Sequence, residues 1–167
     1  VDISSFGVEN GVAEYHAILQ LTDKFANAYT QYQHIELALD RLLQSEELQN
    51  TVLVLKRYFV SDATNQSEFL NKGNDTCAIS VVQQPPMNGT KVAIWAYFVE
   101  NSEMCTDESG TSVVVRPKYK HLYNTQLHKP LKDEYKETEF IFNTYLSSLA
   151  KHGCTLKDNC IRTWIYV

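Results

Sequence analysis

The sequence contains one succession of elements twice, and this internal repeat constrains the fold more than any other feature. An apolar helical segment leads through Leu48 into a β-rich run at residues 51–60. A second helical segment leads through Leu156 into a similar run at residues 160–167. Because each copy of a repeat forms one supersecondary unit, the two regions are predicted to share a fold.

The second copy is shorter than the first. After the first copy the chain continues with a short helix and two strands, whereas the second copy stops within its strand. The chain opens on Val1 without a Met and closes on the apolar residues 165–167, although natural chain ends are usually polar and frayed. We therefore expect these 167 residues to be the front part of a longer protein built from similar units.

Composition argues against several classes of function. Apolar residues make up 44% of the chain and charged residues 21%, values that permit a folded core. The net charge of −5 argues against nucleic acid or an acidic membrane as a partner. No apolar run approaches the roughly 18 residues that a membrane span needs. The compartment stays open, with the cytoplasm favoured.

The four cysteines do not form a recognisable metal site. Cys77, Cys105, Cys154 and Cys160 lack the paired spacing of zinc ligands. We expect free thiols in preference to a disulfide, because an even number of cysteines is weak evidence for pairing. The histidines show no ligand spacing either, so no metal or other cofactor is expected.

Hydrophobic periodicity predicts an α+β unit over residues 1–100. The expected order is strand, helix, strand, short helix, strand, strand, at residues 14–21, 25–43, 51–60, 64–71, 76–83 and 91–100. Thr22 and Asp23 are the expected N-cap residues of the long helix. Asn88 and Gly89 form a strong turn signal, so the last two strands are predicted to pair as an antiparallel hairpin. The helices should cover one face of a mixed sheet.

A second, incomplete unit is predicted over residues 111–167. The polar and acidic residues 101–110 read as a linker between the units. The elements expected after it are strands at 111–115 and 119–125, a helix at 132–152 and a strand at 159–167. Gly153 is the expected C-terminal stop of the helix.

Three stretches of the chain resemble the RidA/YjgF family. A Leu-x-x-Leu-Leu helix end followed by Val-Leu-Val-Leu-Lys-Arg-Tyr-Phe-Val-Ser-Asp, at residues 39–62, is similar to the family's helix-to-strand core. Residues 76–97, two apolar strands around a Pro-containing turn, look like its closing hairpin. Residues 149–167 match the same core, and their Arg162-x-Trp164-x-Tyr166 pattern is similar to the chorismatase relatives, which carry several RidA-like units in one chain.

The resemblance, over roughly residues 14–100 and 132–167, implies a chorismate-mutase-like α+β fold. Units of this family assemble as trimers or pseudo-trimers with clefts between neighbours. RidA enzymes deaminate enamines or imines without a cofactor, and an Arg at the start of the penultimate strand clamps the substrate carboxylate. Here that place falls at Asp75 or Thr76, which offers no positive charge. The first unit is therefore expected not to deaminate such substrates.

Arg116 and His121 are the first pair of candidate binding residues, close to Lys118 and Tyr123. One interpretation is an anion-binding edge that feeds a cleft. The other is an exposed strand face with alternating polar side chains. The sequence leaves both open.

Arg162, Trp164 and Tyr166 are the second set, and they alternate along one predicted strand face. Arg162 could hold a carboxylate beneath an aromatic wall, as the chorismatase resemblance suggests. It could equally stack on Trp164 or pair with an acidic neighbour. We assign no catalytic residue.

The leading functional hypothesis is the non-catalytic N-terminal part of a RidA-like protein, which supports assembly and supplies one wall of a cleft for a small carboxylate metabolite. The alternatives are part of a chorismatase-like hydrolase or lyase that acts on chorismate or a related enol compound, and a protein-binding module. The expected partner is another copy of the chain, with a trimer as one candidate assembly, or a C-terminal continuation. The apolar strand at 159–167 should then be covered, either by the first unit's sheet or by another copy.

Overall fold

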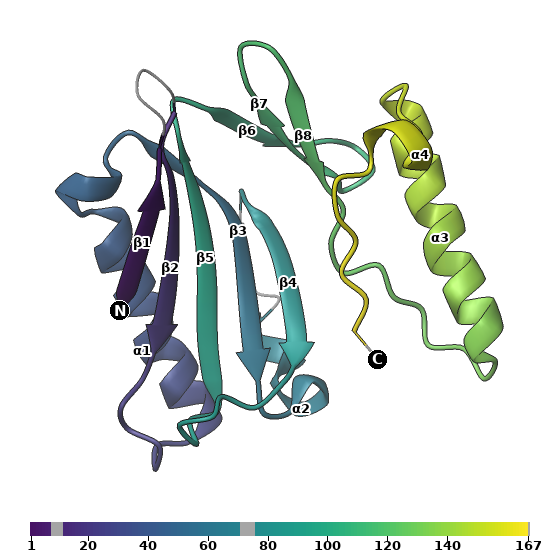
Figure 1. The fold of residues 1–167 in the computed structure, drawn as a ribbon. Helices are drawn as coiled ribbons and strands as arrows, with labels where there is room; N and C mark the ends of the chain where they lie inside the picture. Colours follow the sequence, from purple (N-terminus) through teal and green to yellow (C-terminus); the bar gives the residue numbers. More distant parts are fainter. Residues whose placement is uncertain (8–11, 71–75, 167) are drawn as a thin grey trace.

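The computed structural model describes residues 1–7, 12–70 and 76–166 (Figure 1). Its main element is a five-stranded mixed sheet with the order β1-β2-β5-β3-β4. These strands are β1 (Asp2–Phe6), β2 (Glu14–Gln20), β3 (Thr51–Val60), β4 (Ala78–Gln83) and β5 (Val92–Glu100). β3 and β4 are parallel, and the other neighbours are antiparallel.

Two helices cover one face of this sheet, which confirms the predicted α+β architecture. They are α1 (Ala28–Leu43) and α2 (Ala63–Leu70), with the short 3-10 helix η1 (Glu46–Leu48) after α1. The core between helices and sheet contains buried side chains from both the helices and the sheet, including Leu19, Ile35, Leu39, Tyr58, Leu70, Ile94 and Phe98. The N-cap of α1 is Asn27, whose side chain accepts a hydrogen bond from the amide of Thr30 at 2.8 Å. Thr22 and Asp23 do not cap it, and Asp23 instead closes the preceding turn.

The predicted hairpin between residues 76–83 and 91–100 is wrong. β5 lies between β2 and β3, whereas β4 is at the sheet edge and pairs only with β3. The Asn-Gly turn is present, with Gly89 at φ +83, but the Asn88 amide donates to the carbonyl of Leu21 at 2.9 Å. This bond ties the turn to the end of β2. β5, which is almost wholly buried, occupies the central position of the sheet.

A register shift in β3 between Leu53 and Leu55 decides which side chains face away from α1. Beyond it, Tyr58 and Val60 join the helix-side core, so Leu55 and Arg57 point to the opposite face, because side chains alternate along a strand. We call this opposite side the open face of the sheet.

The second part of the chain forms a three-stranded antiparallel sheet of β6 (Glu103–Thr106), β7 (Ser112–Val115) and β8 (Lys120–Tyr123), followed by α3 (Glu134–Lys151). Part of the predicted linker at 101–110 is therefore a strand, because residues 103–106 form β6. A tight turn closes the β6–β7 hairpin: Asp107 accepts from the amides of Ser109 and Thr111, and Gly110 has φ +81.

The predicted strand at 159–167 is also wrong. α3 ends near Gly153 at φ +68, as expected, but a one-turn helix α4 (Leu156–Asn159) follows, capped by Thr155. Residues 160–166, the C-terminal segment, are extended but pair with no strand among the described residues, and Val167 lies outside them. The first sheet therefore does not cover this segment by strand pairing, and Ile161 and Ile165 stay exposed.

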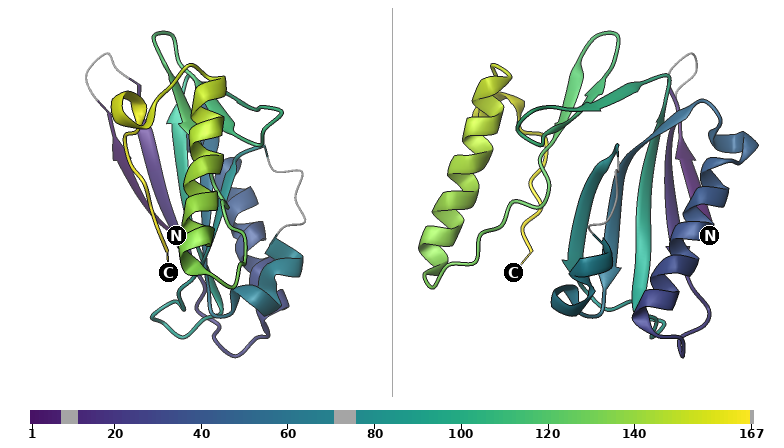
Figure 2. Two further views of the ribbon diagram at one scale, coloured as in Figure 1. Left: turned by 90° about the vertical axis from the view of Figure 1, so that its right-hand side faces the viewer. Right: turned by 180° about the vertical axis from the view of Figure 1, so that it is seen from behind.

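α3 and the C-terminal segment lie across the five-stranded sheet from α1 (Figure 2). The layers are thus helices, sheet, and a second body of segment and helix. The open face of the sheet points toward the second body.

Candidate functional site

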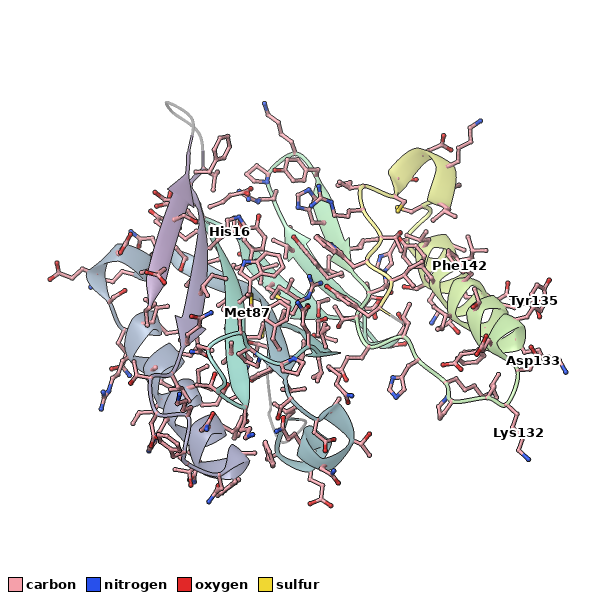
Figure 3. All side chains as sticks on the ribbon, turned by 60° about the horizontal axis from the view of Figure 1, so that its bottom comes forward. His16, Met87, Lys132, Asp133, Tyr135 and Phe142 are labelled. Atoms are coloured by element: carbon pink, nitrogen blue, oxygen red, sulfur yellow. The ribbon has the colours of Figure 1, made fainter. Side chains whose placement is uncertain are left out.

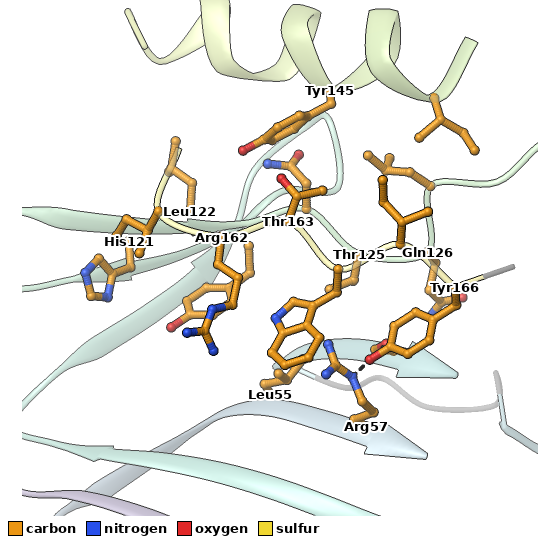
Figure 4. Close-up of a pocket in the computed structure, with 18 of the residues that line it drawn as sticks. Leu55, Arg57, His121, Leu122, Thr125, Gln126, Tyr145, Arg162, Thr163 and Tyr166 are labelled. Atoms are coloured by element: carbon orange, nitrogen blue, oxygen red, sulfur yellow. Dashed lines mark hydrogen bonds between the residues drawn. The ribbon is translucent and has the colours of Figure 1, made fainter. Parts of the chain in front are cut away.

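A cavity of about 1020 Å³ lies between the open face and the second body (Figure 4). The sheet contributes Arg57, Ser80 and Trp95, and the second body contributes α3, the C-terminal segment and residues 120–128. A volume of this size is at the upper end of the roughly 300–1,000 Å³ typical of small-molecule sites.

Arg57 is the charged centre of the sheet wall. It follows Lys56 in the otherwise largely apolar strand β3 and is only 6% exposed. Its Nε donates to Ser80 Oγ at 3.2 Å, across the β3–β4 pair. Three rings face its guanidinium carbon, with centroids at 5.1 Å (Trp95), 5.0 Å (Trp164) and 5.4 Å (Tyr166).

The charge of Arg57 has no acidic counterpart among the described residues. Burial lowers the pKa of its guanidinium, and the phenol of Tyr166 opposes that shift; an arginine nevertheless stays protonated. Aromatic rings contact a guanidinium through their faces, so they do not satisfy its N–H donors. In the described part of the chain the two Nη nitrogens have no hydrogen-bond partner. The group is therefore prepared to bind an anion in its plane.

Arg162 points into the same space from the opposite wall (Figure 4). Its guanidinium carbon lies 5.3 Å from the Trp164 ring centroid, so it does stack on Trp164, and it also lines the cavity. Both guanidinium carbons are within 5.3 Å of one ring centroid, which places them at most about 10 Å apart. No ion pair of Arg162 occurs among the residues that the structure describes.

Three stacked rings extend the sheet wall beyond Arg57. His16 lies 5.7 Å from Trp95 and 4.8 Å from Tyr97, with interplanar angles of 21° and 15°. Trp95 Nε1 donates to His16 Nδ1 at 3.2 Å, so that nitrogen carries no proton in this arrangement. These three stacked rings give the cavity a flat and rigid aromatic wall.

Arg116 is neither an anion-binding edge nor part of an exposed strand face. Its side chain is buried, and Nη2 pairs with Glu14 Oε1 at 3.3 Å. This pair links the end of β7 to β2, and the carboxylate of Glu14 neutralises the charge. The Tyr97 hydroxyl also forms a hydrogen bond with Glu14. Burial is the main cause that raises the pKa of Tyr97, and this hydrogen bond is the second.

His121, one of the binding candidates from the sequence, lines the cavity. Burial, reinforced by the charge of Arg116, lowers the pKa of its imidazole. The ring is therefore neutral near pH 7, and it offers one donor and one acceptor without adding charge. The neighbouring Tyr123 is also half-buried, and burial raises its pKa to about 12.

Sequence reasoning missed Arg57, Trp95 and His16. A signal for Arg57 was present, because Lys56 and Arg57 interrupt a strand that is apolar on both faces, and charged residues are almost never buried without a role. Trp95 and His16 carried no comparable signal, because their stack depends on β2 and β5 being neighbours.

The described residues contain no group of three His, Cys, Asp or Glu side chains that could hold a metal ion. Within the same part of the chain, none of the helices has the length and apolar character to cross a membrane. Comparisons with protein-family models, curated proteins and solved structures found no match for this chain.

Proposed function

We propose that this chain is a RidA/YjgF-like unit whose open sheet face forms one wall of a cleft for a small carboxylate metabolite. The observation that carries the proposal is Arg57, a buried guanidinium under aromatic rings with free in-plane donors. An uncompensated buried charge is costly, and a bound carboxylate would compensate it.

The family part of the proposal draws support from the element order. The described elements run strand, strand, helix, strand, helix, strand, strand, with both helices on one face of a mixed sheet, and the resemblance implied an α+β fold of this kind. The family's carboxylate clamp would stand at the start of β4. Thr76, just before that strand, offers no charge, and Asp75 lies outside the described residues. Arg57 on the neighbouring β3, opposite Ser80 in the register, supplies a guanidinium beside the same strand.

The proposed role is binding and assembly without catalysis, with another copy of the chain as the proposed partner. The exposed apolar side chains of the C-terminal segment, Ile161 and Ile165, favour such a partner. A 2-aminoacrylate imine should hydrolyse no faster with the protein than in buffer. Clear acceleration would refute the non-catalytic part.

Benzoate is a suitable first probe, because it combines one carboxylate with one flat ring. Isothermal titration calorimetry should detect its binding, and Arg57→Met should weaken it. A hydrogen bond to a charged group contributes about 1.5–3 kcal/mol, which corresponds to a loss of roughly tenfold to a hundredfold in affinity. Arg41→Met is the matched control, since Arg41 is an exposed arginine on α1. Equal benzoate affinity in the Arg57 and Arg41 variants would refute the proposal, and so would equal affinity for the uncharged benzamide.

A second candidate function is favoured by the two arginines that share Trp164. Guanidinium groups at most about 10 Å apart suit a ligand with two acidic groups, and chorismate or a related enol compound has that character. In this candidate the intact protein is a chorismatase-like hydrolase or lyase, and Arg162 binds one carboxylate. Chorismate should then bind more tightly than benzoate, and Arg162→Met should remove the difference. An Arg162 variant with unchanged chorismate affinity and turnover would exclude Arg162 from the site.

A further inference from the structure

α3 is attached to the rest of the molecule at its C-terminal end. Ser148 and Leu149 are its buried residues, and both lie in its last two turns. Upstream of them, Ile141, Phe142 and Tyr145 line the cavity and do not enter a core. A surface helix normally buries an apolar stripe along its whole length, so most of α3 stands over the cavity with little packing.

Two groups of polar contacts hold this end. Ser148 Oγ lies 2.7 Å from Thr111 Oγ1 and donates to Asn124 Oδ1 at 2.6 Å. His152 Nε2 lies 2.8 Å from Asp107 Oδ2. These contacts join α3 to the β6–β7 turn and to the end of β8, and they define a pivot.

The outer end of α3 has no such attachment. Lys132, Asp133 and Tyr135 point away from the five-stranded sheet (Figure 3). Among the described residues, the hydrogen bonds and ion pairs of positions 133–147 stay within α3 or reach Cys160. The connection at residues 124–133, between β8 and α3, contains no helix or strand, so it can follow a movement of the helix.

The C-terminal segment contacts the guanidinium of Arg57 on the sheet wall. Trp164 and Tyr166 stack on Arg57, and the segment forms no strand pair in the described part of the chain. The second body is thus fixed at a pivot and rests on the sheet through two ring contacts, with the cavity between these points.

We infer that α3, α4 and the C-terminal segment form a hinged lid over the cavity, and that an anion bound by Arg57 closes it. This inference rests on the proposed function for the identity of the closing ligand. A carboxylate that binds in the plane of the Arg57 guanidinium leaves both faces of that group to the aromatic rings. The ligand and the lid can therefore contact Arg57 at the same time. Closure also removes water from the ion pair, which strengthens it. If the closed lid raises the affinity for the ligand, the bound ligand must stabilise the closed lid by the same free energy, because such coupling is reciprocal.

Spin labels can measure the lid position. The pair Met87→Cys and Tyr135→Cys, both at exposed positions, spans the sheet and the outer end of α3, in a background with Cys105, Cys154 and Cys160 changed to Ser. Double electron–electron resonance should give two distance populations without ligand and only the shorter one with saturating benzoate. Trp164→Ala combined with Tyr166→Ala should leave mainly the longer distance.

A control pair at Met87, between β4 and β5, and Leu37 on α1 lies outside the lid and should give one unchanged distance. A single distance for the Met87–Tyr135 pair, unaffected by benzoate and by removal of both rings, would overturn the lid. Calorimetry with benzoate distinguishes the proposed carboxylate site from the proposed lid. If benzoate fails to bind, the proposed function falls, while the effect of removing the rings still decides whether the lid exists. If benzoate binds without changing the distances, ligand-driven closure is refuted and the carboxylate site stands.

Discussion

The ion pair between Glu14 and Arg116 offers a quantitative test of how the two sheets are joined. The Arg116 side chain is 3% exposed and that of Glu14 is 32% exposed. Glu14→Ala therefore leaves a buried guanidinium without its counter-charge, and its Nε already lacks a partner in the described part of the chain. Arg116→Leu, in contrast, leaves a carboxylate that water can still reach.

The expected magnitudes follow from this asymmetry. Breaking a buried ion pair by removing one partner destabilises a protein by about 3–5 kcal/mol. We expect the lower end, about 3 kcal/mol, for Glu14→Ala, because solvent enters beside the removed carboxylate, while the Tyr97 hydroxyl also loses an acceptor. Arg116→Leu should destabilise by about 1–2 kcal/mol, since it leaves no buried charge behind. The double variant should be close to Arg116→Leu alone, because the orphaned charge is gone.

Urea unfolding followed by circular dichroism measures these differences. With a typical urea dependence of about 1–3 kcal/mol per molar, Glu14→Ala should move the midpoint down by about 1–3 M. Glu103→Ala is the control, an exposed carboxylate on β6 that should change little. If Glu14→Ala were as stable as the control, or if Arg116→Leu were the more damaging change, the claim that Arg116 is a neutralised structural cation would be refuted.

Two further predictions concern titratable groups near the lid. Hydrogen bonds from Ser109, Thr111 and His152 hold the pKa of Asp107 well below its usual range; this stabilisation is present above the ordinary carboxyl pKa and is lost as pH falls toward the depressed one. Urea midpoints should therefore decline below pH 4 in the unmodified protein and decline less in Asp107→Asn, and equal slopes would contradict the prediction. Hydrogen bonds from Thr163 and Tyr145 lower the pKa of the Cys160 thiol. Tyr145→Phe should thus shift its alkylation by iodoacetamide to higher pH, as read by peptide mass spectrometry, and an unchanged pH profile would show that this bond is absent in solution.

The elements of this protein followed from its sequence wherever local interactions decide. The stripe at residues 25–43 predicted a helix, which forms from Ala28 to Leu43, and the apolar run at 51–60 and the glycine stop at 153 predicted what formed there. Periodicity and backbone conformation act over a few residues, so they can be read directly from the chain. The α+β class followed in the same way.

Strand partnership was decided by tertiary structure. A turn signal at Asn88 and Gly89 cannot show that β5 will pass β4 and insert between β2 and β3. Likewise, the β-rich residues 160–166 lacked a partner strand among the described residues and stayed extended. A strand is stable only as part of a ladder, and the neighbour that completes the ladder is remote in sequence.

The residues of the candidate site were likewise predictable from the sequence only in part. The sequence named Arg162, Trp164, Tyr166, His121 and Arg116 as binding candidates, and all of them except Arg116 line the cavity. The sequence carried a signal for Arg57 but not its role, because that role depends on the β3 register shift, on the pairing with β4 and on the rings that a distant segment places over it. Residue chemistry is local, but burial and charge balance are properties of the assembled fold.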